Sequence, residues 1–444
     1  MAEIKIDFSK KIGPMKPMHG VNNGPLTCNF SRDARPLFKE AGIPFSRLHD
    51  TEYPFGSGEF VDISCIFKNF DADVNDPDSY NFALTDLYLK AIDECDTKII
   101  YRLGVSIEHN PVKRHIFPPR SFEKWAQICE HIIMHYNYGW ADGYNLGIEY
   151  WEIWNEPNHA KDLKMWGGPA EDFAHLYDTA AKHLKNRFPE LKIGGPAFSN
   201  PDGEFVDAFF TELTKDGNHP PMDFYSWHGY IDNIESAVER AYRAENTLKK
   251  YGYDGAESIY DEWNYVKSWK DMKGNIAVMH SHKGAAFNAA IMSAMQNAPC
   301  DIMAFYDAQM KFSESWCSLF SMGNDYINGG ANILIPQKPF FAFKAFNEVY
   351  KCKEQVSLSS DDERLYAVAA SNGDTHAVLV SSFAAVDEEL SEKEVSFKLC
   401  GTNGKTAEIY MCDESNDLKK IGTVLSEEFS VVMKPYSFLL VKFS

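Results

Sequence analysis

In two short stretches of the sequence, a run of mostly apolar residues is followed by a glutamate. In residues 150–158, Tyr-Trp-Glu-Ile-Trp-Asn-Glu-Pro-Asn, aromatic and β-branched residues favour a strand that stops at the proline, which puts Asn155 and Glu156 at its C-terminal end. In residues 258–264, Ser-Ile-Tyr-Asp-Glu-Trp-Asn, Glu262 takes the equivalent place. A carboxyl group beside a carboxamide and two indole rings suits a sugar, because it can move a proton while the rings stack on C–H faces. A strand that ends in a polar turn is the alternative for either stretch alone.

Two carboxyl groups that face one another across a ligand are what hydrolysis of a glycosidic bond requires. In the retaining reaction, one group protonates the leaving oxygen and the other attacks the anomeric carbon, at a separation of about 5–5.5 Å. At that distance the charge on one group raises the pKa of the other, so that only one is ionised near neutral pH. For Glu262 alone, a solvated carboxylate before a core tryptophan is the alternative.

Strand-like runs alternate with amphipathic helical segments through most of the chain. The strands are expected at residues 18–23, 44–49, 98–105, 148–156, 191–198, 224–230, 258–264 and 302–309. The helices are expected at residues 32–41, 82–95, 121–137, 170–187, 204–215, 233–250, 282–297 and 338–350. Such alternation implies parallel strands, and its length predicts an α/β fold, the (β/α)8 TIM barrel, whose active site lies at the C-terminal ends of the strands. A doubly wound open sheet is the alternative, but no G-x-G-x-x-G motif follows a strand.

The pattern changes after about residue 352. Short alternating runs separated by polar turns predict an accessory antiparallel β-sandwich. These runs lie at residues 365–368, 376–380, 394–397, 407–411, 429–433 and 438–443. Residues 2–8 also alternate and are expected to form an edge strand of that sandwich. We therefore expect a catalytic barrel at residues 14–351 and a sandwich made of residues 1–13 and 352–444.

The composition limits the partners of this chain. Its 444 residues carry a formal net charge of −20 at pH 7, so the phosphates of nucleic acid and an anionic membrane surface would repel it. We expect a neutral oligosaccharide or glycoside as substrate, with no cofactor, and leave homo-oligomerisation open.

The nine cysteines are scattered, odd in number and without a C-x-x-C pair. They predict buried reduced thiols in a cytoplasmic protein rather than a disulfide framework or a zinc site. The first residues contain no apolar signal core, and no run of 18 apolar residues occurs. A secreted or periplasmic protein whose signal peptide had been removed would have the same pattern.

Residues 151–157, Trp-Glu-Ile-Trp-Asn-Glu-Pro, resemble the acid/base signature of clan A glycoside hydrolases. They are most similar to glycoside hydrolase family 39, the β-xylosidase and α-L-iduronidase family. The resemblance extends to residues 47–49, 226–230 and 260–264 and to the layout of a barrel with a β-sandwich, so it covers nearly the whole chain.

The resemblance implies roles for particular residues. Glu156 would be the general acid/base and Glu262 the nucleophile of a retaining, exo-acting, β-xylosidase-like glycosidase. The binding roles it implies are a hydrogen bond from Asn155 to the sugar 2-hydroxyl, contacts of His49 and His228 with sugar hydroxyls, and hydrogen bonds from Arg47 and Tyr230 to the nucleophile. Two further candidates for substrate contact are Asp307, at the end of the eighth strand, and Trp316, in the loop that follows it. Core packing is the alternative for Trp316.

The sequence departs from the family pattern at the walls of the sugar pocket. The usual Arg-Phe-His-Gly reads Arg-Leu-His-Asp at residues 47–50, and Glu-Leu-Gly-Phe reads Arg-Leu-Gly-Val at residues 102–105. These differences leave the substrate open. The alternatives are an α-L-arabinofuranosidase, an endo-acting exopolysaccharide hydrolase and a non-catalytic carbohydrate-binding barrel.

Two other groups of residues have structural interpretations. His131 and His135 have the spacing of a metal pair on a helix, but no third ligand accompanies them, so we expect a surface pair and no metal site. Glu152 has the same parity as Glu156 in its strand, so we expect it to point into the barrel and form an ion pair with Arg102.

Overall fold

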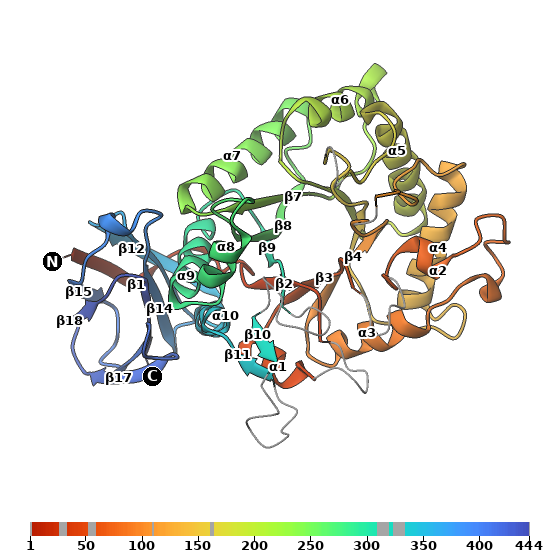
Figure 1. Ribbon diagram of the computed structural model, residues 1–444. Coiled ribbons are helices and arrows are strands. Elements are labelled where there is room, and N and C mark those ends of the chain that lie inside the picture. The colour runs from red at the N-terminus through yellow and green to blue at the C-terminus, as the bar shows by residue number, and fades with distance from the viewer. Residues whose placement is uncertain are drawn as a thin grey trace.

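The computed structural model describes residues 2–25, 33–51, 59–108, 111–159, 164–308, 319–322 and 334–443. Trp316 lies outside these residues. Figure 1 shows two units, a barrel of strands surrounded by helices and, at its side, a sheet that combines the N-terminal strand with the C-terminal strands.

Eight parallel strands close the barrel in chain order, and β9 pairs with β2. They are β2 (Gly20–Asn22), β3 (Phe45–Arg47), β4 (Lys98–Leu103), β5 (Tyr150–Ile153), β6 (Lys192–Phe198), β7 (Phe224–Ile231), β8 (Glu257–Tyr265) and β9 (Ile302–Phe305). The predicted (β/α)8 barrel is therefore confirmed. β5 is shorter than predicted, because Trp154 and Glu156 have φ angles of 75° and 43°, which take the backbone out of the extended conformation.

The helices cover the outside of the barrel (Figure 1). Those at the predicted places are α1 (Arg35–Ala41), α3 (Ala83–Asp93), α4 (Phe122–Tyr138), α5 (Ala170–Arg187), α6 (Glu204–Leu213), α7 (Ile234–Tyr251), α9 (His282–Met295) and α10 (Lys338–Tyr350). Elements that were not expected are α2 (Ile63–Ile66), α8 (Met272–Met279), the 3-10 turns η1 (Pro77–Ser79), η3 (Lys215–Gly217) and η4 (Asp387–Glu389), and the strand pair β10 (Phe320–Met322) and β11 (Leu334–Pro336). The side chains of Ser121 and Asn233 cap α4 and α7 by accepting a backbone N–H from the first turn.

The inside of the barrel changes from apolar to charged along the strands. Its N-terminal end is filled by an apolar layer made of Phe45, Ile100, Tyr150, Phe224, Ile259 and Ile302. Side chains two residues further along a strand point to the same face. The next layer is accordingly polar and buried, and consists of Arg47, Arg102, Glu152, Ser226 and Asp261. The apolar layer closes the bottom of the barrel, so the polar groups are directed toward its C-terminal mouth.

The second unit is a nine-stranded sheet in the order β17-β16-β19-β14-β13-β12-β1-β15-β18. Its strands are β1 (Ala2–Pro14), β12 (Glu354–Ser360), β13 (Leu365–Ser371), β14 (His376–Ser382), β15 (Lys393–Cys400), β16 (Ala407–Cys412), β17 (Lys419–Val424), β18 (Glu428–Met433) and β19 (Ser437–Phe443). β12 and β17 were not expected. The prediction that the N-terminal strand lies at an edge is wrong, because β1 pairs antiparallel with β12 and parallel with β15.

Alternation within this sheet gives it two apolar faces. One set of side chains, including Ile4, Val380 and Val441, forms a core of its own. The opposite set on β13, β14 and β19, including Leu379 and Leu440, belongs to the core of the barrel unit and packs beside α9 and α10. The sheet is therefore joined to the barrel by apolar burial.

Among the described residues, no helix is long and apolar enough to span a membrane. The described cysteines, Cys65, Cys95, Cys129, Cys300, Cys352, Cys400 and Cys412, have free thiols.

The expected surface position of the histidine pair on α4 is wrong. His131 and His135 are 8% and 2% exposed. Nδ1 of His131 contacts the carbonyl oxygen of Gln127, and Nε2 of His135 lies 2.9 Å from Oδ1 of Asp86 on α3. The two rings face the buried side of the helix, where they make these contacts.

Candidate active site

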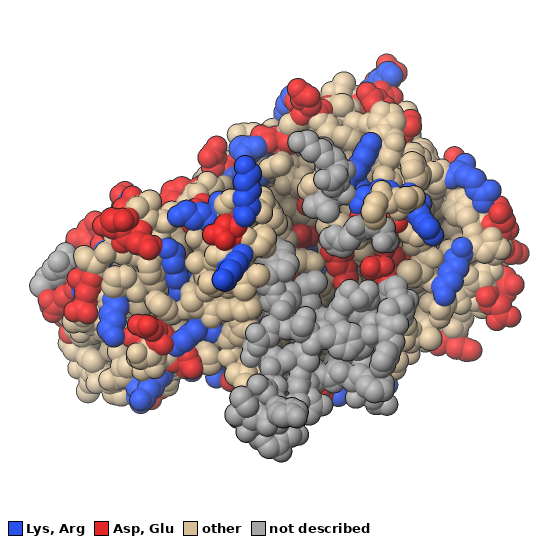
Figure 2. Space-filling view, in the orientation of Figure 1, with Lys and Arg blue, Asp and Glu red and all other residues tan. Residues whose placement is uncertain are grey.

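The sequence-predicted site residues that the structure describes gather at the C-terminal mouth of the barrel. Glu156 follows β5, His228 and Tyr230 lie on β7, and Glu262 lies on β8. Figure 2 shows acidic side chains at the bottom of a hollow over β3 and β4. The mouth of the barrel is thus both recessed and acidic.

Glu156 is directed into the mouth by an unusual turn after β5. The positive φ of Trp154 and Glu156 is uncommon for residues with side chains, and such conformations are often found at functional sites. The turn buries the Trp154 indole, whose Nε1 donates to the carbonyl oxygen of Met165 at 3.1 Å. Trp151 points outward from the barrel and stacks on Tyr101. The prediction that these two indoles stack on a sugar is therefore wrong, since both rings belong to the core.

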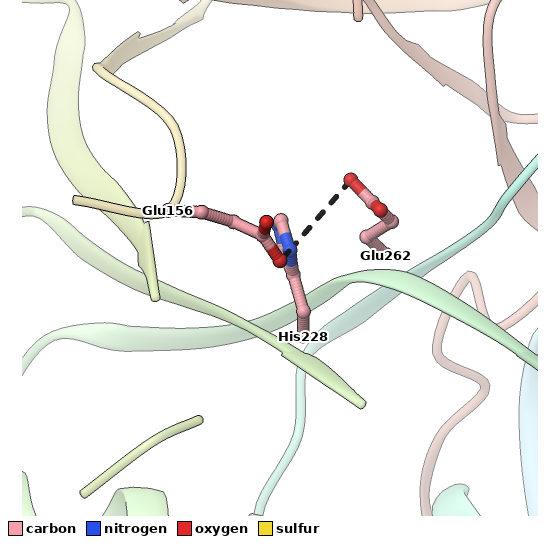
Figure 3. Close-up of side chains that lie close together, drawn as sticks. All are labelled: Glu156, His228 and Glu262. Carbon is pink, nitrogen blue, oxygen red and sulfur yellow. Dashed lines mark hydrogen bonds and ion pairs between the residues drawn. The ribbon is translucent and has the colours of Figure 1, made fainter. Parts of the chain in front are cut away.

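Glu262 is held by two donors. The hydroxyl of Tyr230 donates to its Oε1 at 2.5 Å, and Nη1 of Arg47 lies 3.2 Å from its Oε2. Figure 3 shows the Glu156 and Glu262 side chains approaching one another, with His228 beside them. One oxygen of each glutamate and one ring nitrogen of His228 lie within 4.8 Å of one another.

His228 connects the two glutamates. Its Nδ1 lies 2.8 Å from Oε1 of Glu156 and 3.6 Å from Oε2 of Glu262, and its Nε2 lies 3.5 Å from Oδ1 of Asp261. Burial opposes a charge on the ring, but the charges of Glu262 and Asp261 outweigh burial and raise the pKa of His228 to about 10. At neutral pH both ring nitrogens are therefore hydrogen-bond donors.

The two glutamates titrate as a pair. Burial raises the pKa of Glu262 to about 7, with the charge of Glu156 adding to the effect and the charges of His228 and Arg47 opposing it. Burial acts in the same direction on Glu156, but the hydrogen bond and charge of His228 outweigh it and lower the pKa of Glu156. At mildly acidic pH the pair therefore holds one proton, and the directions of the two pKa shifts favour Glu262 as its place.

Asn155 and Arg47 form the next part of the site. Nη2 of Arg47 donates to Oδ1 of Asn155 at 2.7 Å, which fixes the orientation of the carboxamide. Nδ2 of Asn155 is buried without a hydrogen-bond partner. The carboxamide therefore retains an N–H group beside Glu156 that can donate a hydrogen bond to an oxygen of a ligand.

His49 follows β3 and Asp307 follows β9 at the mouth of the barrel. Nε2 of His49 lies 3.3 Å from Oδ2 of Asp50. Nδ2 of Asn23 donates to Oδ2 of Asp307 at 3.0 Å, whereas Oδ1 of Asp307 is buried without a hydrogen-bond partner. Burial raises the pKa of Asp307 to about 8, because the hydrogen bond from Asn23 only partly offsets it and nearby acidic groups add to it.

Three residues of the site were not predicted as functional. Glu152 and Asp261 lie under the two glutamates, and both contact Arg47. The expected ion pair between Glu152 and Arg102 is wrong, because Arg102 pairs with Asp62 at 2.6 Å instead. The third residue is Trp269, which follows β8; it is 60% exposed, and the centre of its ring lies 5.1 Å from that of the Tyr230 ring.

Glu156, His228 and Glu262 are also close enough together to surround a metal ion. The hydrogen bond from His228 to Glu156 accounts for the close approach instead.

The sequence and the fold of this chain are both similar to those of known glycosidases. The sequence model of "Glycosyl hydrolases family 39" matches residues 4–295. A beta-xylosidase from Caldicellulosiruptor saccharolyticus is 26% identical over 406 residues, which cover 83% of this chain and 76% of the relative. Solved structures of a glucosidase from Croceicoccus marinus (TM-score 0.77, 21% identity) and a monomeric beta-xylosidase from Caulobacter crescentus (TM-score 0.72, 15% identity) each cover 100% of this chain and 99% of their own. These two structures share its fold.

Proposed function

Because the chain belongs to glycosyl hydrolase family 39 and is therefore a glycoside hydrolase with a carbohydrate substrate, we propose that it releases terminal β-xylose units by a retaining double displacement. The observation that supports this reaction best is the approach of Glu156 and Glu262 to within 4.8 Å. Retaining enzymes hold their two carboxyl groups about 5–5.5 Å apart, whereas inverting enzymes leave about 6.5–9.5 Å for a water molecule.

In the first step, a carboxylate oxygen of Glu262 attacks the anomeric carbon while the bond from that carbon to the leaving oxygen breaks. Glu156 gives its proton to the leaving oxygen, so the aglycone departs as an alcohol and Glu262 becomes a glycosyl ester. In the second step, Glu156 removes a proton from water, and the resulting hydroxide displaces Glu262 from the anomeric carbon. Two inversions at one carbon give net retention.

The reaction needs the shared proton on Glu156, whereas the pKa directions of the ligand-free site favour Glu262. Substrate binding supplies a reason for the proton to move. The leaving oxygen accepts a hydrogen bond from protonated Glu156, and the positive charge that develops at the anomeric carbon stabilises ionised Glu262. Tyr230 and Arg47 already donate to Glu262 and favour its ionised form.

The charges of the mouth favour a neutral sugar. The buried carboxyl groups near the strand ends are Asp62, Glu152, Glu156, Asp261, Glu262 and Asp307, and the buried basic groups are Arg47, Arg102, His49 and His228. Arg47 and Arg102 already pair with carboxyl groups, so neither guanidinium is left to bind the carboxylate of a uronic acid. Xylose carries no charge, and a beta-xylosidase is among the relatives of this chain.

Purified protein assayed with aryl β-xyloside, aryl β-glucoside and aryl α-L-arabinofuranoside tests the substrate. The proposal requires the β-xyloside to have the highest kcat/KM and the first product to be the β-anomer by NMR. An activated 2-fluoro xyloside should label Glu262 covalently, and Glu262→Ala should abolish both labelling and turnover while retaining the wild-type circular dichroism spectrum. An α-anomer as first product would refute retention.

A further inference from the structure

Two more buried carboxyl groups lie beneath the glutamate pair, Glu152 on β5 and Asp261 on β8. Both residues are 0% exposed. Nε of Arg47 lies 2.7 Å from Oε2 of Glu152 and 2.9 Å from Oδ2 of Asp261. One N–H group cannot be well aligned with both oxygens, and its hydrogen bond goes to Glu152. Two carboxylates held this close repel one another unless one of them is protonated.

Several atoms around this pair lack a hydrogen-bond partner. They are Oε1 of Glu152, both carboxyl oxygens of Asp261 and Nε2 of His228. Buried polar atoms are normally satisfied, so a group of adjacent exceptions requires an explanation. A proton on Glu152 that is donated to Asp261, together with donation from Nε2 of His228 toward Oδ1 of Asp261 at 3.5 Å, accounts for all three residues.

The charge of the buried site leads to the same conclusion. During attack Glu262 must be ionised and Glu156 protonated, so the anions are Glu262, Asp261 and, if it is charged, Glu152. Only Arg47 and His228 oppose them within this contact group. With Glu152 neutral, two anions face two cations and no uncompensated charge is buried.

We propose that Glu152 and Asp261 share one proton beneath the reaction site and act as positioning residues, with Asp261 holding the His228 imidazolium against Glu156. This inference rests on the proposed roles of Glu156 and Glu262. The groups that face the pair from neighbouring strands are Arg47 on β3, Arg102 on β4, Ser226 and His228 on β7, and Glu262 on β8. Burial raises the pKa of Glu152 to about 8, with the charge of Arg47 opposing it and that of Asp261 adding to it, which agrees with a protonated Glu152.

The shared proton gives His228 a fixed orientation. Asp261 accepts from one ring nitrogen while the other donates to Glu156, so the ring cannot turn away when the proton moves within the glutamate pair. Neutral Glu152 leaves the negative charge of the lower pair on Asp261, where it stabilises the imidazolium.

Three variants separate this arrangement from ordinary packing. Glu152→Gln keeps a neutral hydrogen-bonding group, Glu152→Ala removes it, and Asp261→Asn removes the charge next to His228. Asp62→Asn is the matched control, because it changes a buried carboxyl group at the same mouth that contacts Arg102 rather than His228. The readouts are NMR titration of labelled His228, the infrared band of protonated carboxyl groups at pH 7, and kcat/KM for the aryl xyloside.

We expect Glu152→Gln to lose one protonated-carboxyl band at pH 7, to leave the His228 titration unchanged and to keep kcat/KM within about threefold of wild type. Asp261→Asn should make His228 neutral at lower pH and reduce kcat/KM on the order of 10²-fold, the lower range of general acid–base catalysis. Glu152→Ala should lose activity that Glu152→Gln retains. An unchanged infrared band in Glu152→Gln, or a His228 shift in that variant as large as in Asp261→Asn, would overturn the proposal. The spectroscopic readouts need no turnover, so they remain decisive even if the wild-type protein does not cleave xylosides.

Discussion

Replacement of Tyr230 by phenylalanine removes one hydroxyl group from the site. That hydroxyl donates a 2.5 Å hydrogen bond to Oε1 of Glu262 and favours the ionised form of the carboxyl group. A hydrogen bond to a charged group contributes about 1.5–3 kcal/mol. Since one pKa unit corresponds to about 1.4 kcal/mol, we expect the pKa of Glu262 to rise by about 1–2 units from its value near 7.

The rate should change together with the pKa. In the proposed mechanism the active form of the enzyme has one proton on the glutamate pair, so the basic limb of the kcat/KM profile follows the loss of that proton. Without the Tyr230 hydroxyl the pair holds its proton more tightly, and the basic limb moves to higher pH by about 1–2 units. The proton also rests more firmly on Glu262, so the form with protonated Glu156 becomes rarer. The same 1.5–3 kcal/mol corresponds to a decrease of about 10- to 150-fold in kcat/KM.

The assay is the pH dependence of kcat/KM for an aryl β-xyloside. Tyr225→Phe is the matched control, because Tyr225 lies on the same strand but donates its hydroxyl to the carbonyl oxygen of Pro201 at 2.8 Å, outside the mouth. The control should lose some stability and keep the wild-type pH profile. A basic limb that stays in place in Tyr230→Phe, or moves to lower pH, would refute the reasoning about the shared proton.

Three further substitutions test other parts of the site. Glu156→Ala should accumulate the glycosyl enzyme with a substrate whose leaving group needs no protonation, and azide should restore turnover as a β-glycosyl azide; a product of opposite configuration would contradict the assigned roles. Asp307→Asn should stabilise the fold, because a buried carboxyl whose pKa is raised from about 4 to about 8 costs stability increasingly as pH rises between those values. The gain in melting temperature should therefore be near zero at about pH 4, grow to about pH 8 and then level off, and a gain independent of pH would exclude this cause. Trp269→Ala should raise KM for aryl xylosides about 2- to 12-fold with little change in kcat, as expected for the loss of about 0.5–1.5 kcal/mol of stacking; an unchanged KM would remove Trp269 from the substrate path.

The barrel was predictable because its strands and helices have clear and local sequence patterns. The conformation at the end of β5 was not, since nothing local indicates that Trp154 and Glu156 adopt positive φ. The alternation of side chains along a strand could have predicted the direction of Trp151. Its neighbours Tyr150 and Glu152 face the barrel interior, so Trp151 must face outward, where it stacks on Tyr101.

Errors at other positions arose from contacts between distant segments. Arg102 pairs with Asp62, which precedes a short helix that the sequence did not reveal, and Glu152 was thereby left to Arg47. His135 is buried against Asp86 from the preceding helix, a contact that spacing within α4 cannot indicate. The approach of Glu156 to Glu262 could be predicted from the sequence, because the barrel fold itself brings the C-terminal ends of all its strands to one face.

The position of β1 has a consequence for biosynthesis. In the finished sheet Ile4 lies opposite Ser360 of β12 on one side and opposite Phe397 of β15 on the other. A ribosome that adds about 5–20 residues per second would need on the order of 20–80 s to reach Ser360 after it has added Ile4. During that interval the apolar side of β1 has no partner strand, so nascent chains are open to mispairing with one another. The yield of folded protein would then depend on how well a chaperone shields β1 until β12 and β15 have been made.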